Sequence, residues 1–197
     1  TTTSGTSANV AASTDVAGPF VFNLVQVQDA NSTLAVSGQS ATITVRELPS
    51  ISAGVDQAVC IGGSVTLNGT GGVSYSWNNN VMNNVSFIPS ATATYTVSGA
   101  DSNGCVNTDD VVVTVNALPI VSAGSDIAVC KGSNATLSGS GASTYTWDNN
   151  VVNGTAFAPA ATATYTVTGT DVNGCVNTDQ VVVAAVSYTH LRAHETL

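Results

Sequence analysis

The chain contains the same sequence twice, with the two copies 70 positions apart. Residues 48–115 align with residues 118–185 without an insertion or deletion. Three pairs of equivalent residues show the spacing: Cys60 and Cys130, Trp77 and Trp147, and Cys105 and Cys175. An internal repeat fixes the folding unit before any helix or strand is predicted. The sequence therefore predicts tandem copies of a small module, and modules of that kind usually space, display or bind.

Each copy is dense in strand signals and lacks helical periodicity. Runs of β-branched and aromatic residues arrive about every 8–12 residues, with Gly, Asn, Asp and Pro between them. The first copy predicts strands over 51–59 (broken near Ala53-Gly54), 64–68, 73–78, 85–88, 92–100 and 109–116. The second predicts 121–129, 134–138, 143–148, 155–158, 162–170 and 179–186. This spacing indicates an all-β sandwich, with Val73, Tyr75 and Trp77 on one face of the third strand.

The two repeats occupy residues 48–117 and 118–186, and each begins with a Leu-Pro pair. Residues 1–47 are expected to form a partial β module, the closing strands of an upstream repeat. Within it, Phe20, Phe22 and Leu24 alternate along one predicted strand, and residues 41–45 form another, with a turn near residues 29–31.

The two ends of the chain are treated apart from the repeats. Because the chain opens on Thr1 and not on Met, we expect a truncated or processed start. Residues 187–197 carry both histidines and resemble the translated read-through of a sequencing adapter. We therefore treat this segment as a non-native tail and leave it out of the fold.

A string of short motifs runs through both repeats. Each reads Leu-Pro, Ala-Gly-x-Asp, Val-Cys-x-Gly, Thr-Leu, Tyr-x-Trp, Pro-x-Ala-Thr-Ala-Thr-Tyr-Thr-Val, Asp-x-Asn-Gly-Cys and Val-Val-Val. This string resembles the PKD-like or Ig-like tandem repeats of large surface proteins in bacteria that use type IX secretion and gliding motility. The resemblance covers Pro49 to Val186 well and residues 17–48 loosely. It implies tandem Ig/PKD-like antiparallel β-sandwiches, export, and a place in an adhesin or beside a secreted enzyme.

Each repeat holds two cysteines, and so small a module is expected to need a staple. Four cysteines allow three pairings. We predict Cys60–Cys105 and Cys130–Cys175, because the repeat is the unit that recurs. The first turn and the last hairpin of an Ig-like sandwich can lie at opposite ends, so a Cys60–Cys175 bond and four free thiols stay open. Two cysteines without a histidine do not complete a tetrahedral zinc site.

The aromatic residues have two interpretations. Trp77 and Trp147 are expected in the core, because each module has one Trp to fill its interior and Ig-like sandwiches bury a Trp on the third strand. Tyr95 and Tyr165 are likewise expected to be packing residues, each with a hydrogen-bonded hydroxyl. The alternative is a sugar-stacking platform formed by each Trp and the Tyr two residues before it.

The segment Asp-x-Asn-Gly is a weak calcium candidate. Asp101 and Asn103, and Asp171 and Asn173 in the second repeat, place oxygen ligands before a Gly, as in part of an EF-hand loop. The distal bidentate Glu of that loop is missing. The simpler interpretation is that Asp caps a turn that Asn-Gly forms.

Composition limits the partners and the chemistry. Only 8% of residues are charged, and the net charge is −9. Three cations cannot neutralise a run of phosphates, so neither nucleic acid nor an anionic membrane surface is an expected partner. No apolar stretch approaches the roughly 20 residues of a membrane helix. The repeats contain no His, and no Ser or Cys has an adjacent base motif, so we expect no enzyme and no cofactor.

These observations predict a non-catalytic structural and adhesion segment of a secreted bacterial cell-surface protein, acting as a spacer and display array. Its expected partners are neighbouring repeats and a surface glycan or protein ligand. Two alternatives remain: a carbohydrate-binding accessory module of a secreted hydrolase, and a strand-exchanging filament subunit that pairs through residues 1–47. Paired cysteines in a small β module favour an oxidising compartment, and thus an extracellular or cell-surface location.

Overall fold

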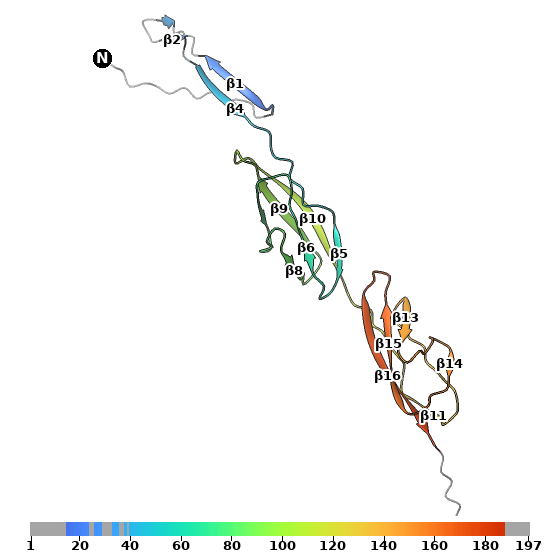
Figure 1. The fold of residues 1–197 in the computed structure, drawn as a ribbon. Coiled ribbons are helices and arrows are strands. Elements are labelled where there is room, and N and C mark those ends of the chain that lie inside the picture. The colour runs from blue at the N-terminus through green and yellow to red at the C-terminus, as the bar shows by residue number, and fades with distance from the viewer. Residues whose placement is uncertain (1–14, 24–25, 29–32, 36–37, 39, 188–197) are drawn as a thin grey trace, which may run out of the picture. The chain divides into compact units, whose positions relative to one another are not determined.

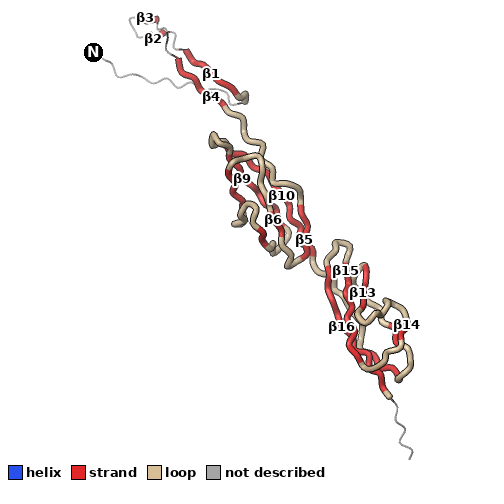
Figure 2. Tube along the Cα trace, viewed as in Figure 1, coloured by secondary structure: helices blue, strands red, loops and turns tan. Residues whose placement is uncertain are grey.

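The computed structural model describes residues 15–23, 26–28, 33–35, 38 and 40–187. Every regular element among these residues is a β-strand (Figures 1 and 2). The prediction of an all-β fold is therefore confirmed. Within the described part of the chain, no helix is long and apolar enough to span a membrane.

The first repeat contains six strands in two sheets. They are β5 (Gln57–Cys60), β6 (Val65–Thr66), β7 (Ser74–Trp77), β8 (Ser86–Phe87), β9 (Ala93–Ala100) and β10 (Val106–Asn116). Four of them form one sheet in the order β5-β10-β9-β7, and the other two pair as β6-β8. β5 runs parallel to the end of β10, whereas β7 and β9 are antiparallel.

The second repeat has the same strands in the same order. They are β11 (Ile127–Cys130), β12 (Ala135–Thr136), β13 (Thr144–Trp147), β14 (Ala156–Phe157), β15 (Ala163–Thr170) and β16 (Val176–Val186). Its sheets are β11-β16-β15-β13 and β12-β14. The 70-residue sequence repeat is thus also a repeat of the strand order.

The order of the strands makes each repeat an Ig-like β-sandwich. An Ig domain places its third, penultimate and last strands side by side in one sheet, which β7, β9 and β10 reproduce. The entry strand changes sheets, because Ser52 bridges Thr70 while β5 joins β10. Gly54 lies between these two pairings with φ of 88°, a conformation that favours glycine. The predicted break near Ala53-Gly54 is confirmed.

Apolar side chains from both sheets meet in the core of each repeat. In the second repeat, Ala135 and Leu137 cluster with Trp147, Val167 and Val183. Along β15 the burial alternates with a period of two, as expected for a strand with one face inward. The buried residues of β15 and β16 are Tyr165, Val167, Gly169, Val181 and Val183, and all except Gly169 belong to types that favour strands.

Two expectations about the strands of the first repeat need correction. Val73 was expected to begin the third strand on the same face as Tyr75 and Trp77, but it precedes β7 and is 70% exposed. Its backbone N–H bonds to the carbonyl of Ala100, which leaves its side chain outside the core. The last strand also begins at Val106, three residues before the predicted start.

The described part of residues 1–47 forms two hairpin-like pairs. β1 (Gly18–Asn23) pairs antiparallel with β4 (Ser40–Val45), and β2 (Gln26–Gln28) pairs antiparallel with β3 (Thr33–Ala35). Leu24 and the turn predicted near residues 29–31 lie outside the described residues, as do residues 188–197 of the tail.

Backbone contacts divide the chain into two compact units, and the division runs through the first repeat. One unit comprises Thr1–Ala53, Asn68–Asn83 and Thr96–Asp110. The other comprises Gly54–Leu67, Asn84–Tyr95 and Val111–Leu197, so it holds both Cys60 and Cys175.

Candidate functional site

Two of the four cysteines of the repeats form a disulfide. Cys60 is bonded to Cys175, with 5.6 Å between their Cα atoms, within the usual range for a disulfide. Cys105 and Cys130 are free. The bond therefore joins the first repeat to the second, and it lies within a single compact unit.

The predicted pairing within each repeat is wrong, and the geometry of the last strand explains why. Cys60 is in register with Asn116, the last residue of β10, whereas Cys105 directly precedes Val106, the first residue of that strand. β10 has 11 residues, so its ends are about 33 Å apart at a rise of roughly 3.3 Å per residue. A disulfide needs Cα atoms within about 7 Å. The alternative Cys60–Cys175 bond is the one that the structure contains.

A tight turn holds each cysteine that precedes the last strand. One carboxylate oxygen of Asp101 accepts hydrogen bonds from the backbone N–H of Asn103 (2.8 Å) and of Cys105 (2.9 Å). The other accepts from the side-chain amide of Asn103 at 3.1 Å. These bonds hold the pKa of the Asp101 carboxyl below its ordinary value, and the bond from the Asn103 side chain has the largest effect. The turn thus fixes the backbone of the cysteine.

The calcium candidates have this turn-forming role. Asp171 accepts from the backbone N–H of Asn173 (2.9 Å) and of Cys175 (2.8 Å), as Asp101 does in the first repeat. In the part of the chain that the structure describes, no group of three or more His, Cys, Asp or Glu side chains is arranged to hold a metal ion. In both turns the aspartate accepts hydrogen bonds from the backbone N–H of the asparagine and of the cysteine that follows the glycine.

The two tryptophans are buried, at 8% exposed for Trp77 and 9% for Trp147. The indole N–H of Trp147 donates to the side-chain oxygen of Asn153 at 3.0 Å, and the same oxygen accepts from the backbone N–H of Gly139 at 2.8 Å. Asn83 makes the same two bonds in the first repeat. A ring held in this way cannot serve as an exposed platform for a sugar.

Tyr95 and Tyr165 are also buried, each 6% exposed. The ring of Tyr165 lies 5.1 Å from that of Phe157, and the matching distance from Tyr95 to Phe87 is 5.2 Å. Such tilted aromatic pairs add to the stability of a core. All four aromatic residues proposed for the core therefore occupy its interior.

Sequence reasoning missed the aspartates that tie the entry segment to the last strand. The carboxylate of Asp109 accepts from the backbone N–H of Ala53, and that of Asp56 from the N–H of Val112, both at 2.8 Å. Asp179 repeats the first contact through Ala123, and this bond, foremost among its causes, lowers the pKa of its carboxyl. A signal was present, because both repeats keep Asp at these two positions.

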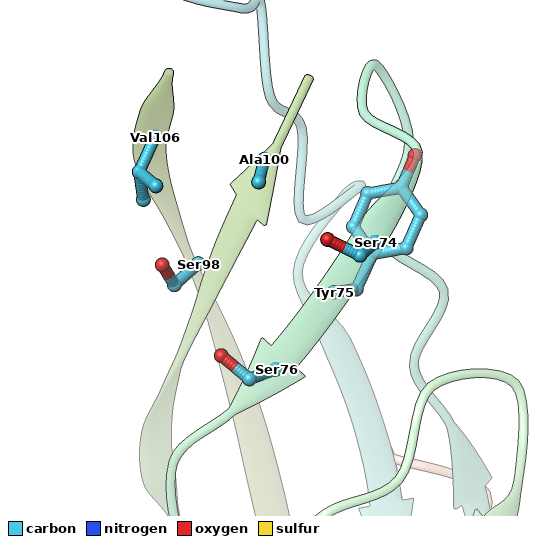
Figure 3. Close-up of a pocket in the computed structure, with 6 residues that line it drawn as sticks. All are labelled: Ser74, Tyr75, Ser76, Ser98, Ala100 and Val106. Carbon is cyan, nitrogen blue, oxygen red and sulfur yellow. The ribbon is translucent and has the colours of Figure 1, made fainter. Parts of the chain in front are cut away.

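The outer face of the four-stranded sheet carries a shallow hollow in the first repeat (Figure 3). Its volume is about 230 Å³, below the roughly 300–1,000 Å³ of typical ligand pockets. Three serine hydroxyls line it together with Ala100 and Val106. The Tyr75 hydroxyl at its side is already bonded to both backbone groups of Gly72. The hollow offers hydrogen-bonding hydroxyls and no acid, base or activated nucleophile.

Comparisons with known proteins give likenesses to Ig-domain structures. The first two Ig domains of DIP-gamma align with 73% of this chain and 99% of that structure, at 12% identity and a TM-score of 0.35. The N-terminal eight Ig domains of Down Syndrome Cell Adhesion Molecule, isoform 1.30.30, align with 87% of this chain and 32% of that structure, at 16% identity and a TM-score of 0.29. No protein-family model and no curated protein matches the chain. Because these scores are low, the Ig-like assignment rests on the strand order.

Proposed function

We propose that this chain is a non-catalytic spacer and display segment of a secreted bacterial cell-surface protein. The observation that carries the proposal is the disulfide between Cys60 of one repeat and Cys175 of the next. The motif string shared with surface-protein repeats supports the bacterial setting. A disulfide persists in oxidising compartments and is rare in the cytosol, which supports export.

The disulfide suits a segment that carries tension. A force applied at the two ends of the repeats enters through the entry segment of the first repeat and reaches Cys60. From there it crosses the disulfide to Cys175 and leaves through β16. The intervening residues, a separation of 115, are then shielded from extension. Two cross-linked sandwiches therefore keep their length under a load that would stretch an unlinked pair.

Force spectroscopy on single molecules checks this path of tension. Opening the loop between Cys60 and Cys175 releases about 400 Å of chain, since an extended residue spans roughly 3.5 Å. We expect full unfolding to give a contour length shorter by that amount without reductant than with it. Equal lengths under the two conditions would show that tension does not pass through the disulfide.

The display role is tested by placing a reporter at its far end. A short peptide epitope is fused after Ser187, and the chain is displayed on bacteria. We expect a large antibody to bind the epitope on the intact chain. Removal of residues 48–186 should abolish this binding, and an unrelated spacer of similar length in their place should restore it. A spacer that fails to restore access would indicate a specific role for these repeats.

The purified chain is used to test the two alternatives, a carbohydrate-binding module and a filament subunit. A carbohydrate-binding module needs an accessible aromatic row, and the buried state of Trp77 and Trp147 argues against one at those residues. Saturable binding of a glycan that disappears when Ser76 and Ser98 are replaced, with the fold intact, would favour the sugar-binding alternative. Concentration-dependent assembly that requires residues 1–47 would favour the filament.

A further inference from the structure

The four cysteines fall into two structural classes. Cys60 and Cys130 end the entry strands β5 and β11, and we call them strand-end cysteines. Cys105 and Cys175 follow the Asp-x-Asn-Gly turns, and we call them turn cysteines. The disulfide joins the strand-end cysteine of the first repeat to the turn cysteine of the second. What remains free is one member of each class, Cys105 and Cys130.

The free turn cysteine has the same local structure as the bonded one. The backbone N–H of Cys105 donates to Asp101 at 2.9 Å, and that of Cys175 donates to Asp171 at 2.8 Å. The carbonyl of each cysteine accepts from the N–H of its aspartate at 3.0 Å. The turn is thus built in the same way whether or not the sulfur has a partner.

The free strand-end cysteine also matches its bonded counterpart. Cys130 is in register with Val186, as Cys60 is with Asn116. The next residue donates its backbone N–H to the end of the last strand in both repeats, Ile61 at 2.8 Å and Lys131 at 2.9 Å. Each half of the disulfide is therefore present in both repeats.

Each free cysteine is more exposed to solvent than its bonded counterpart, as expected for a sulfur without a bonded partner. Cys175 is 0% exposed and Cys60 is half-buried in the bonded pair. Their free counterparts are more open, since Cys105 is half-buried and Cys130 is exposed. Neither free cysteine is fully buried.

We propose that Cys130 and Cys105 are half-sites for further disulfides of the Cys60–Cys175 kind. Cys130 would bond to the turn cysteine of a repeat placed after the second one, and Cys105 to the strand-end cysteine of a repeat placed before the first. Adjacent repeats would then be linked one by one along an array. The inference deepens the proposed spacer function and rests on it.

The bond forms by thiol–disulfide exchange with a low-molecular-weight disulfide such as oxidised glutathione. The thiolate of one cysteine attacks a glutathione sulfur, which forms a mixed disulfide and releases one glutathione thiolate. The second cysteine thiolate attacks the mixed disulfide and releases the other. The two cysteines are oxidised by two electrons, and the oxidant is reduced to two thiols, because the two released glutathione thiolates take up the two protons that the cysteines lose.

The test uses the full chain lengthened by a second copy of residues 118–187, inserted after Ser187. The unmodified chain, oxidised with glutathione and alkylated under denaturing conditions, is expected to show two free thiols, at Cys105 and Cys130. The lengthened chain has six cysteines, and we again expect two free thiols. Peptide mapping should find Cys130 joined to the turn cysteine of the added copy. Four free thiols would overturn the proposal and leave the spacer function standing.

Matched variants of the lengthened chain are expected to show that Cys130 is paired in it and that Cys105 is free. Cys130→Ser should raise the count to three free thiols, because the added turn cysteine loses its partner. Cys105→Ser should lower it to one, because this residue has no partner there. An unmodified chain without free thiols, in which peptide mapping finds Cys60 joined to Cys105 and Cys130 joined to Cys175, would instead show pairing within the repeats. That result would remove the path of tension in the proposed function together with this inference.

Discussion

The two repeats share nearly all their internal contacts and differ in the state of their cysteines. The hydrogen bond from the indole N–H of Trp to the Asn side chain measures 3.0 Å in both repeats. The hydrogen bond from the backbone N–H of Ala53 to Asp109, and the equivalent bond from Ala123 to Asp179, both measure 2.8 Å. The strand-end cysteine, however, is bonded in the first repeat and free in the second. The contacts inside a repeat are therefore determined by the sequence of that repeat, whereas the state of a cysteine depends on the adjacent repeats.

Loss of the disulfide should give the largest effect on stability. Closing a loop of this length stabilises a fold by roughly 5 kcal/mol in the loop-entropy model. Cys60→Ser should lower the free energy of unfolding by about that amount, measured by urea denaturation without reductant. Cys130→Ser changes the equivalent residue of the other repeat, which is exposed and free, and should cost less than about 0.5 kcal/mol. Equal losses in the two variants would show that the disulfide at Cys60 does not stabilise the fold more than the free thiol at Cys130.

A glycine in the second repeat gives the next largest effect. Gly141 has φ of +86°, and a Cβ built on it would lie 1.8 Å from the carbonyl oxygen of Ile120. Gly141→Ala should destabilise the second repeat by about 4 kcal/mol or more, since neither backbone segment can move away without breaking the Ser122–Ser140 bridge. Gly124→Ala is the control, with φ of +83° and nothing within 4 Å, and should cost about 1–2 kcal/mol.

Fluorine NMR of fluorotryptophan-labelled protein reads the two repeats separately, because each contains a single Trp. In Gly141→Ala we expect the signal of Trp147 to shift to its unfolded position at a lower urea concentration. The signal of Trp77 should stay close to its wild-type transition. A common shift of both signals would mean that the repeats unfold as one cooperative unit.

The asparagine that holds the tryptophan should have an intermediate effect. Asn153→Ala leaves the indole N–H of Trp147 and the backbone N–H of Gly139 without an acceptor, and each unsatisfied group costs about 1–3 kcal/mol. We expect a total loss near 3 kcal/mol, together with a shift of the indole proton resonance. Asn153→Asp keeps an oxygen acceptor and should lose less than half as much. An Asn153→Ala variant with the wild-type free energy of unfolding would show that these two hydrogen bonds do not stabilise the repeat.

Much of the fold could be predicted from the sequence because its signals are local. The alternation of Tyr95 and Val97 marks an inward strand face, and Gly54 marks the change of sheets. Val73 was misplaced because alternation does not reveal where a strand begins. Its β-branched side chain has a strand preference, yet the pairing of β7 with β9 begins only at Ser74.

The cysteine pairing and the aspartate contacts could not be predicted from local signals. The partner of Asp109 lies 56 residues away, and the partner of Cys60 lies 115 residues away. Both depend on which end of β10 faces which segment, and this follows only from the parallel register of β5 and β10. The internal repeat also led to the wrong prediction of the disulfide. Bonds between neighbouring repeats are compatible with the 70-residue period, just as bonds within each repeat are.

The smallest expected effect is a change in acid stability from Asp179. The N–H of Ala123, foremost, and that of Gln180 lower its pKa in the folded state from the ordinary value of 3.8. A carboxyl with a lowered folded pKa contributes stability that is fully present above its unfolded pKa and is lost as the pH falls through the folded pKa. We therefore expect the urea midpoint of the second repeat, followed through Trp147, to fall with pH below about 4. Asp179→Asn should flatten that fall while leaving the response of Trp77 unchanged. An unaltered acid profile in the variant would show that the bond to Ala123 does not depend on the charge.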